Sequence, residues 1–310
     1  RLKKVEAEVI KLLIEKIKKQ WDKIIECIKP VLELDIAIAS YELSEKFGLK
    51  RPCFNSSKIS IKNGVFLPLK HLLDGMGIKY VPLNFSFDKR INIIQGSNMG
   101  GKTVVLKTVT FLQYMAQAGF FVPAENFDTV IFNRISVLIP DEEIKGLSSF
   151  AYEINDLSLE LKNISDGKVL MILDEFARTT NVNEGLALVN AIVEYFSNRD
   201  NVYFFLATHL GNILKFNQVD FLRMKGFNRE NYLKHGLKDL KDVRERIKII
   251  NRFMDYEIVR VMDSSILTSD AIEIARIIGI NDDIYKKAKK YLEVIYEKDR
   301  TEKQNTTAEP

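Results

Sequence analysis

The sequence predicts an α/β fold in which helices cover a mostly parallel sheet. Apolar strand-like runs at 168–173 and 202–207 alternate with stretches of helical periodicity, an alternation typical of parallel sheets. A glycine-rich loop, GSNMGGKT at 96–103, follows the strand-like run 90–95 and opens a helical stretch. This order of strand, glycine loop and helix is typical of a phosphate-binding loop, so the fold is predicted to be of the P-loop nucleotide-binding class.

Composition narrows the class of protein further. The 310 residues are 46% hydrophobic and 28% charged, which is enough apolar sequence for a sizeable core. No apolar run approaches the roughly 18 residues of a membrane span, and no secretory segment opens the chain. The two cysteines, Cys27 and Cys53, lack metal-ligand spacing, so we expect two buried thiols in a reducing cytoplasm. A net charge of +4 permits contact with nucleic acid without requiring it.

The first 50 residues form a predicted helical segment. Apolar residues recur at helical spacing through 1–29, and lysines fill the opposite face. We expect one long amphipathic helix that packs on the rest of the protein, with nucleic-acid contact as the alternative. Pro30 is expected to interrupt it, and a second helix is expected over 31–46.

The middle of the chain alternates between the two kinds of element. Further strands are expected over 58–61, 79–83 and 129–139, and helices over 102–118, 149–164 and 183–198.

The C-terminal third is less regular. The basic stretch 225–252 is expected to be an exposed arm or a β excursion. Two helices are expected over 269–297, separated near Gly279, and a disordered polar tail over 298–310.

The loop has the spacing G-x-x-x-x-G-K-[ST]. Its backbone N–H groups must curl around a phosphate chain, and side chains at the glycines would obstruct that curl. Lys102 is expected to neutralise the β and γ phosphates of ATP, and the Thr103 hydroxyl to bind Mg²⁺. The predicted nucleotide contacts are Gly96, Ser97, Asn98, Met99, Gly100, Gly101, Lys102 and Thr103.

Two further positions follow buried strands. The run 168–173 ends in Asp174 and Glu175, where the first carboxylate is expected to hold Mg²⁺ and the second to polarise the attacking water. His209 follows the run 202–207 at the carboxyl edge of the predicted sheet, where ligands bind. A lone histidine is usually structural, but here it is a candidate contact to the γ-phosphate or the water.

Taken together, these segments resemble the ATPase domain of MutS-type mismatch-repair proteins. The resemblance rests on PLNFSFDKRINIIQGSNMGGKT, AQAGFFVPAE, GLSSFAYEI, LMILDEFARTTNVNEGLAL and FFLATH, in that order. It extends more weakly to 34–52, similar to a returning helix with an Arg-Pro turn. It also extends to 268–292, similar to a helix-turn-helix dimerisation element.

The resemblance implies an ABC-superfamily fold over 51–265, a dimerisation element over 266–297, and a homodimer or a heterodimer with a related ATPase. In that family a serine of the partner subunit completes each ATP site. Gly146, Leu147, Ser148 and Ser149 match the loop that carries this serine, so Ser148 is expected to act in trans. The same hydroxyls could also cap a helix.

At several positions this sequence departs from the family pattern, so the resemblance alone does not decide which activity the protein has. Ser97 stands where the family usually has proline, and Ala177, Arg178, Thr179 and Thr180 replace its Gly-Arg-Gly-Thr. Ile78 stands at the position of the family's adenine-stacking aromatic, so the base is expected to be held less specifically. The segments that read mismatches in the family, including a Phe-x-Glu wedge, are absent from this sequence.

Three functions therefore remain as hypotheses. The first is a MutS-type ATPase that acts on mismatched or branched DNA, with DNA contacts outside this chain. The second is a MutS-like reactivating chaperone for a cobalamin-dependent lysine aminomutase, whose client is a metabolic enzyme. The third is a nucleotide-binding module without turnover, which the intact Asp174, Glu175 and His209 disfavour.

Overall fold

The computed structural model describes residues 2–54, 57–97, 99–139, 147–164, 167–234, 243–262 and 270–306. For 147–149, 243–245, 247–248 and 296–306 it describes the backbone alone. None of the described helices is long and apolar enough to cross a membrane.

The centre of the fold is a six-stranded sheet with the order β5-β6-β7-β3-β8-β9. Neighbouring strands from β5 to β8 are parallel, and β9 pairs antiparallel with β8. The mostly parallel sheet predicted from the sequence is therefore confirmed. The strands are β3 (Ile91–Gln95), β5 (Arg134–Leu138), β6 (Val169–Asp174), β7 (Val202–Thr208), β8 (Val219–Phe227) and β9 (Met254–Val261).

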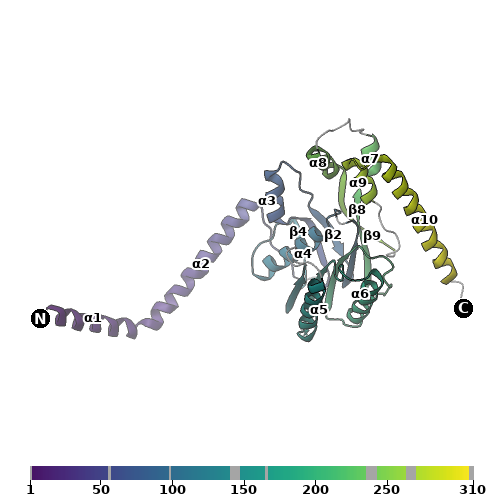
Figure 1. Cartoon of the computed structure of the whole chain (residues 1–310). Coiled ribbons are helices and arrows are strands. Elements are labelled where there is room, and N and C mark those ends of the chain that lie inside the picture. The colour runs from purple at the N-terminus through teal and green to yellow at the C-terminus, as the bar shows by residue number, and fades with distance from the viewer. Residues whose placement is uncertain are drawn as a thin grey trace.

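Both faces of this sheet are covered, as the apolar runs require. Along β6, Leu170 and Ile172 point into one hydrophobic cluster, while Met171 and Leu173 point into the other. Helices α5 (Leu147–Lys162) and α6 (Val182–Ser197) cover the second cluster, and α4 (Lys102–Gln117) covers the first (Figure 1). Because successive side chains of a strand point to opposite faces of the sheet, β6 contributes to both hydrophobic clusters.

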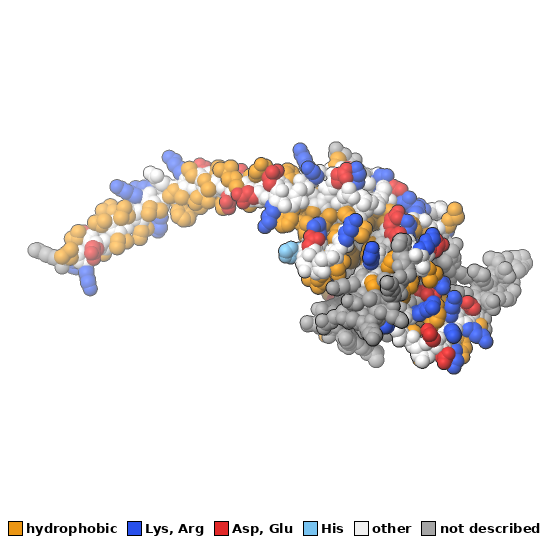
Figure 2. Space-filling model, turned by 90° about the horizontal axis from the view of Figure 1, so that it is seen from above, with side chains coloured by type: hydrophobic (Ala, Val, Ile, Leu, Met, Phe, Trp, Pro, Cys, Tyr) orange, Lys and Arg blue, Asp and Glu red, His pale blue; other side chains and the backbone are white. Residues whose placement is uncertain are grey.

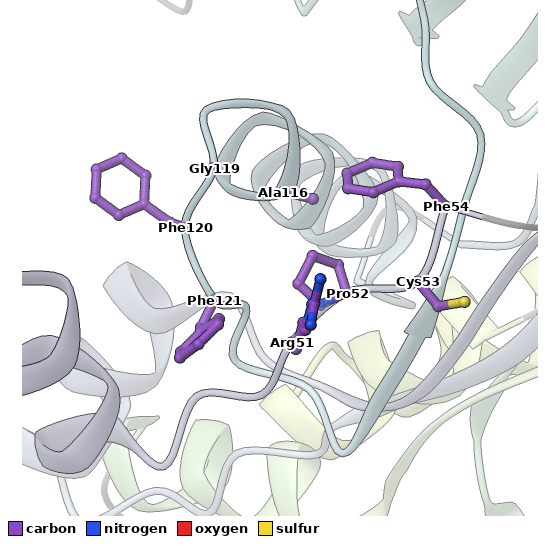
Figure 3. Close-up of a pocket in the computed structure, with 8 residues that line it drawn as sticks. All are labelled: Arg51, Pro52, Cys53, Phe54, Ala116, Gly119, Phe120 and Phe121. Atoms are coloured by element: carbon purple, nitrogen blue, oxygen red, sulfur yellow. The ribbon is translucent and has the colours of Figure 1, made fainter. Parts of the chain in front are cut away.

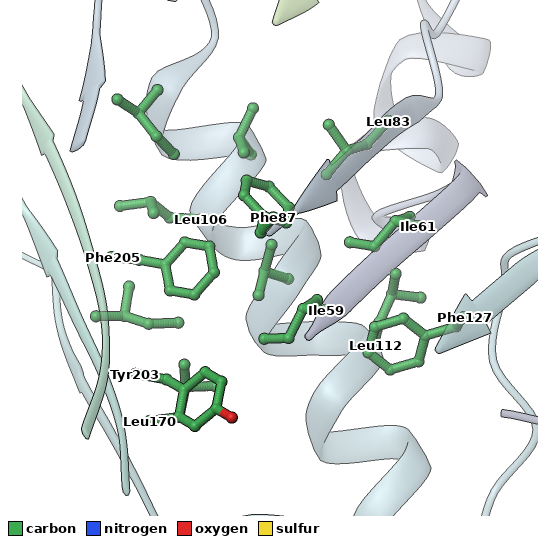
Figure 4. Close-up of a cluster of buried hydrophobic side chains, with 14 of the residues drawn as sticks. Ile59, Ile61, Leu83, Phe87, Leu106, Leu112, Phe127, Leu170, Tyr203 and Phe205 are labelled. Carbon is green, nitrogen blue, oxygen red and sulfur yellow. The ribbon is translucent and has the colours of Figure 1, made fainter. Parts of the chain in front are cut away.

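A small antiparallel sheet of order β2-β1-β4 closes the α4 side. Its strands are β1 (Ile59–Gly64), β2 (Leu83–Phe87) and β4 (Asn126–Asp128), and α3 (Leu67–Gly75) connects the first two. Figure 4 shows Phe87 and Ile59 of this sheet, Leu106 of α4 and Phe205 of the large sheet meeting in one apolar layer. The strand expected over 79–83 begins only at its last residue, and the hydroxyl of Tyr80 accepts a hydrogen bond from the Phe66 N–H (2.9 Å).

The region 225–252, predicted to be an exposed arm or a β excursion, begins as strand and continues as helices among its described residues. Its start belongs to β8, next to the central β3, and it continues into α7 (Arg229–Lys234) and α8 (Val243–Phe253). Ile250 of α8 is fully buried in a third cluster with Phe253, Met254 and Ile274.

Two C-terminal helices follow. Helices α9 (Asp270–Ile278) and α10 (Asp282–Thr306) flank Gly279 as expected. Helix α10 continues to Thr306, past residue 298 where a disordered tail was predicted; 307–310 lie outside the described residues.

The N-terminal helices extend away from the sheets as an arm (Figure 1). Helix α1 (Leu2–Lys19) stops before Gln20, so the one long helix expected over 1–29 is divided there. Helix α2 (Trp21–Phe47) runs through Pro30, so the break predicted at the proline is wrong. A proline removes one hydrogen bond, which an exposed helix tolerates because water can hydrate the freed carbonyl.

This arm also does not pack on the rest of the protein as expected. Helix α1 buries no residue, and the apolar side chains of both helices are exposed along the arm (Figure 2). Cys27 lies on it and is exposed, while Cys53 is half-buried, so the expectation of two buried thiols is wrong.

Candidate functional site

The predicted site residues converge at the carboxyl edge of the large sheet. Strand β7 lies between β3, which leads into the glycine loop, and β6, which ends at Asp174. The register pairs Gln95 with Thr208 and Asp174 with Ala207, so the strands end nearly level. The loop, the acidic pair and His209 therefore share one edge of the sheet, where α/β proteins bind ligands.

The loop backbone depends on its glycines. Gly96 and Gly101 have φ values of +146° and +91°, which side-chain-bearing residues rarely adopt. At Gly100 a Cβ atom would lie 3.0 Å from the Ser97 carbonyl oxygen. No side chain among the described residues caps the N-terminus of α4. The loop is thus a tight curl at a helix N-terminus, a geometry that suits an anion.

Lys102 lies buried against this curl. Its Nζ donates to the carbonyl oxygens of Gly96 (2.9 Å) and Ser97 (3.1 Å), and lies 3.7 Å from Glu175 Oε1. Burial lowers the pKa of Lys102, while the carboxylates of Glu175 and Asp174 oppose that change. A desolvated cation held between the loop and two carboxylates is positioned to meet phosphate oxygens.

Asp174 is paired with Thr103. The Thr103 hydroxyl donates to Asp174 Oδ2 at 2.7 Å, while the buried Oδ1 has no hydrogen-bond partner among the described residues. Burial raises the pKa of Asp174, and the Thr103 hydrogen bond opposes this. An orphaned carboxylate oxygen beside a hydroxyl fits a hard divalent cation such as Mg²⁺, which takes oxygen ligands and retains waters.

Glu175 begins the turn after β6. It has a left-handed φ of +48°, and its N–H donates to the Ala207 carbonyl at 2.8 Å. Its carboxylate lies between Lys102 and Arg178, whose Nη1 is 2.9 Å from Oε2. The strained backbone thus holds the Glu175 carboxylate next to the loop lysine.

Glu153 of α5 is a residue that sequence reasoning missed. Its Oε2 accepts the Ala177 N–H at 2.9 Å, and Ala177 has a left-handed φ of +60°. Burial raises the pKa of Glu153, and the Ala177 N–H opposes that shift. Glu153 therefore supports the turn that follows Glu175, although no local pattern marked it for this role.

His209 lies exposed just beyond β7. Its neighbours fix the backbone on both sides: the Leu210 N–H donates to Thr208 Oγ1 (3.0 Å), and Gln95 Nε2 donates to the Leu210 carbonyl (2.6 Å). These hydrogen bonds hold the backbone that carries His209 at the site edge.

Four other residues are predicted to contact the nucleotide: Met99, Ile78, Asn98 and Ser148. Met99 is exposed, and Ile78 is half-buried between α3 and β2. Asn98 lies outside the described residues. Ser148 falls in the first turn of α5, where only the backbone is described.

A surface pocket of about 520 Å³ lies at the other end of α4. Figure 3 shows Phe120 and Phe121 on one side and Phe54 on another, with Arg51 and Pro52 between them. At about 1.5 Å per helical residue, the pocket is roughly 20 Å from the glycine loop. It is therefore separate from the candidate site.

A glycine loop between a parallel strand and a helix, facing an acidic pair on a nearby strand, defines the P-loop class of α/β domains. Residues 92–296 match the family model of MutS domain V, which is more than half of the chain. The chain therefore belongs to the MutS family, and the resemblance drawn from its sequence is confirmed.

Individual relatives agree with the family model. The chain is 30% identical to the DNA mismatch repair protein MutS of Clostridioides difficile over 215 residues, 67% of this chain and 22% of that protein. It is 28% identical to the MutS of Petrotoga mobilis over 300 residues, 94% and 34% of the two chains. It is also 29% identical to the DNA mismatch repair protein MSH3 of Candida glabrata over 188 residues, 58% and 18%. The chain thus spans at most about a third of these relatives.

Proposed function

We propose that this chain binds Mg-ATP at the 96–103 loop and hydrolyses it. The observation that carries the proposal is the pairing of two loop residues with the acidic pair: Thr103 with Asp174 at 2.7 Å and Lys102 with Glu175 at 3.7 Å. One cation, one hydroxyl and two carboxylates around an anion-binding curl are the groups that phosphoryl transfer to water needs.

Each group has a distinct role. Lys102 binds the β and γ phosphates, for which its buried ammonium must give up the Gly96 and Ser97 carbonyls. Thr103 and Asp174 hold Mg²⁺, which supplies positive charge to the phosphates when bound. Glu175 accepts a proton from the attacking water, and His209 is the second candidate for contact with that water or the γ-phosphate.

The proposed catalytic unit is a dimer of the ABC-superfamily type. In it, Ser148 of one subunit contacts the ATP of the other, and the match of 146–149 to the family loop supports this. A helix N-terminus facing a phosphate across an interface donates backbone hydrogen bonds in addition to its hydroxyl. The composite site links ATP binding to closure of the dimer.

For the complete protein we propose a mismatch-repair-related action on DNA, supported by the names of the relatives. Filter binding of the complete protein to mismatched, branched and plain duplexes tests this. Preferential retention of mismatched or branched duplexes is expected. Equal failure to retain all three would favour the reactivating-chaperone hypothesis instead.

The ATPase proposal is tested with two variants and one control. Lys102→Ala should abolish turnover, whereas Lys162→Ala, which changes an exposed lysine in the last turn of α5, should keep it. Glu175→Gln should still bind ATP but hydrolyse it on the order of 10²–10⁴-fold more slowly, because the amide cannot take a proton. If Glu175→Gln turns over ATP within a few-fold of the parent rate, His209 becomes the first candidate for the general base. Parental turnover in Lys102→Ala would reject the site.

A further inference from the structure

The glycine loop makes a direct contact with the C-terminal helices. Ser97 Oγ donates to Asp270 Oδ2 at 3.1 Å, and Asp270 is the first residue of α9. The same carboxylate oxygen accepts the Phe227 N–H at 3.2 Å, at the end of β8. One carboxylate thus joins the loop, the large sheet and α9.

The close approach of Asp270 depends on the backbone at Gly226. Gly226 has a left-handed φ of +75°, and a Cβ atom there would overlap Oδ2 of Asp270. A residue with a side chain would push the carboxylate away from Ser97. The fold therefore holds a negative charge beside an anion-binding loop, an arrangement that opposes binding of an anion.

Ser97 is also tied to the loop lysine. Lys102 Nζ donates to the Ser97 carbonyl at 3.1 Å, while the Ser97 hydroxyl contacts Asp270. The ring of Tyr256 on β9 lies close to the same loop, since a Cβ built at Gly101 would be 3.1 Å from it. Withdrawal of Lys102 towards a phosphate therefore acts on the same residue that holds α9.

We infer that Ser97 and Asp270 form a latch that couples phosphate occupancy of the loop to the position of α9. Asp270 is a positioning residue, and the inference rests on the proposed binding of ATP at this loop. In the absence of nucleotide, the latch holds α9 on the loop. A bound phosphate repels the Asp270 carboxylate and weakens the latch, and by reciprocity the latch weakens ATP binding.

Neutralising the carboxylate tests the charge. Asp270→Asn keeps an acceptor oxygen for Ser97 and Phe227, so the change is mainly one of charge. Fluorescent ATP should bind this variant roughly five- to tenfold more tightly, because one like charge beside the bound phosphates is removed. Asp282→Asn is the matched control, since it neutralises an exposed carboxylate in the first turn of α10. Its ATP affinity should stay within about twofold of the parent.

Amide hydrogen exchange tests the mechanical half of the inference. In the full parent chain, saturating ATP should speed exchange of the α9 amides between Ile274 and Ile278. Ser97→Ala removes the latch hydrogen bond and should raise this exchange without nucleotide, towards the level that ATP produces in the parent. Circular dichroism shows whether each variant keeps its helices.

Three results overturn the latch. They are unchanged or weaker ATP binding by Asp270→Asn, α9 exchange that does not change when ATP binds the parent, and parental α9 exchange in Ser97→Ala. If Asp270→Asn does not fold, the parent and Ser97→Ala exchange results decide alone. Lys102→Ala separates this failure from that of the proposed function. If Lys102→Ala loses ATP binding while these latch results are negative, only the latch is wrong. If the parent binds no ATP, both fail.

Discussion

Replacing Thr103 with valine removes one hydroxyl and almost no volume. This hydroxyl is the partner of Asp174 Oδ2, at 2.7 Å, and Oδ1 has no partner among the described residues. Thr103→Val removes the hydrogen bond to Oδ2, so neither oxygen of the buried Asp174 carboxylate then has a hydrogen-bond partner in the part of the chain that the structure describes. A hydrogen bond to a charged group contributes about 1.5–3 kcal/mol to stability, so we expect a loss of that size.

Thr108 provides the matched control on the same helix. Its hydroxyl donates at the same 2.7 Å, but to the neutral carbonyl of Val104. Thr108→Val should lower the free energy of unfolding by only about 0.5–1.5 kcal/mol. With a urea m-value of about 3 kcal/mol/M, Thr103→Val should lower the unfolding midpoint by about 0.5–1 M, clearly more than Thr108→Val does.

The loss should depend on pH with a definite sign. Burial raises the pKa of Asp174 and the Thr103 hydrogen bond opposes this, so Thr103→Val raises that pKa further. The folded variant then takes up a proton more readily than the folded parent. The difference in unfolding free energy between the parent and Thr103→Val is largest where Asp174 is ionised. It shrinks as pH falls through the raised pKa of Asp174. Equal midpoints for the two variants, or a Thr103→Val deficit that grows on acidification, would refute this account.

Three further predictions concern other parts of the molecule. Lys102→Ala and Ser148→Ala should each be inactive alone but regain ATP turnover when mixed, because a mixed dimer has one site without defects; no recovery in proven mixed dimers would exclude a shared site. Burial raises the pKa of Glu153 above its ordinary 4.5, so the parent should lose stability relative to Glu153→Gln as pH rises through that raised value. Urea unfolding midpoints of both proteins across pH measure this difference. A difference that does not depend on pH would contradict the prediction. Phe205→Ala should lower the free energy of unfolding by about 3–5 kcal/mol, since its buried ring packs edge-on against Phe87 at 5.0 Å; a loss below about 1.5 kcal/mol in urea unfolding would show that the core collapses into the gap.

The elements that sequence predicted well are those whose pattern is contiguous. Strands β6 and β7 are unbroken apolar runs, and the glycine loop is a short fixed spacing. Strand β8 was missed because Asp220, Arg223 and Lys225 interrupt its apolar pattern. The negative charge of Asp220 is paired with two residues far away in the sequence, Arg260 at 3.0 Å and Lys89 at 3.6 Å. A charge that finds its partners only after folding hides a buried strand from sequence analysis.

The same distinction applies to the candidate site. The local motifs located Lys102, Thr103, Asp174 and Glu175, and the sheet places them on one edge. The contacts that support them join residues far apart in sequence, as Asp270 with Ser97 does. Nothing in the neighbourhood of Asp270 indicates a partner so far away, so this contact required the tertiary structure.

The N-terminal arm has a mechanical consequence. Just beyond α2, Lys50 exchanges backbone hydrogen bonds with Val122, shortly after the C-terminal end of α4, whose opposite end carries Lys102. A 27-residue helix is about 40 Å long, so a tilt of about 5° at this attachment would move the far end of α2 by roughly 3.5 Å. A displacement of a few tenths of an ångström at the base of the arm is multiplied along its length. A small tilt at this attachment would therefore become a larger displacement at the far end of α2.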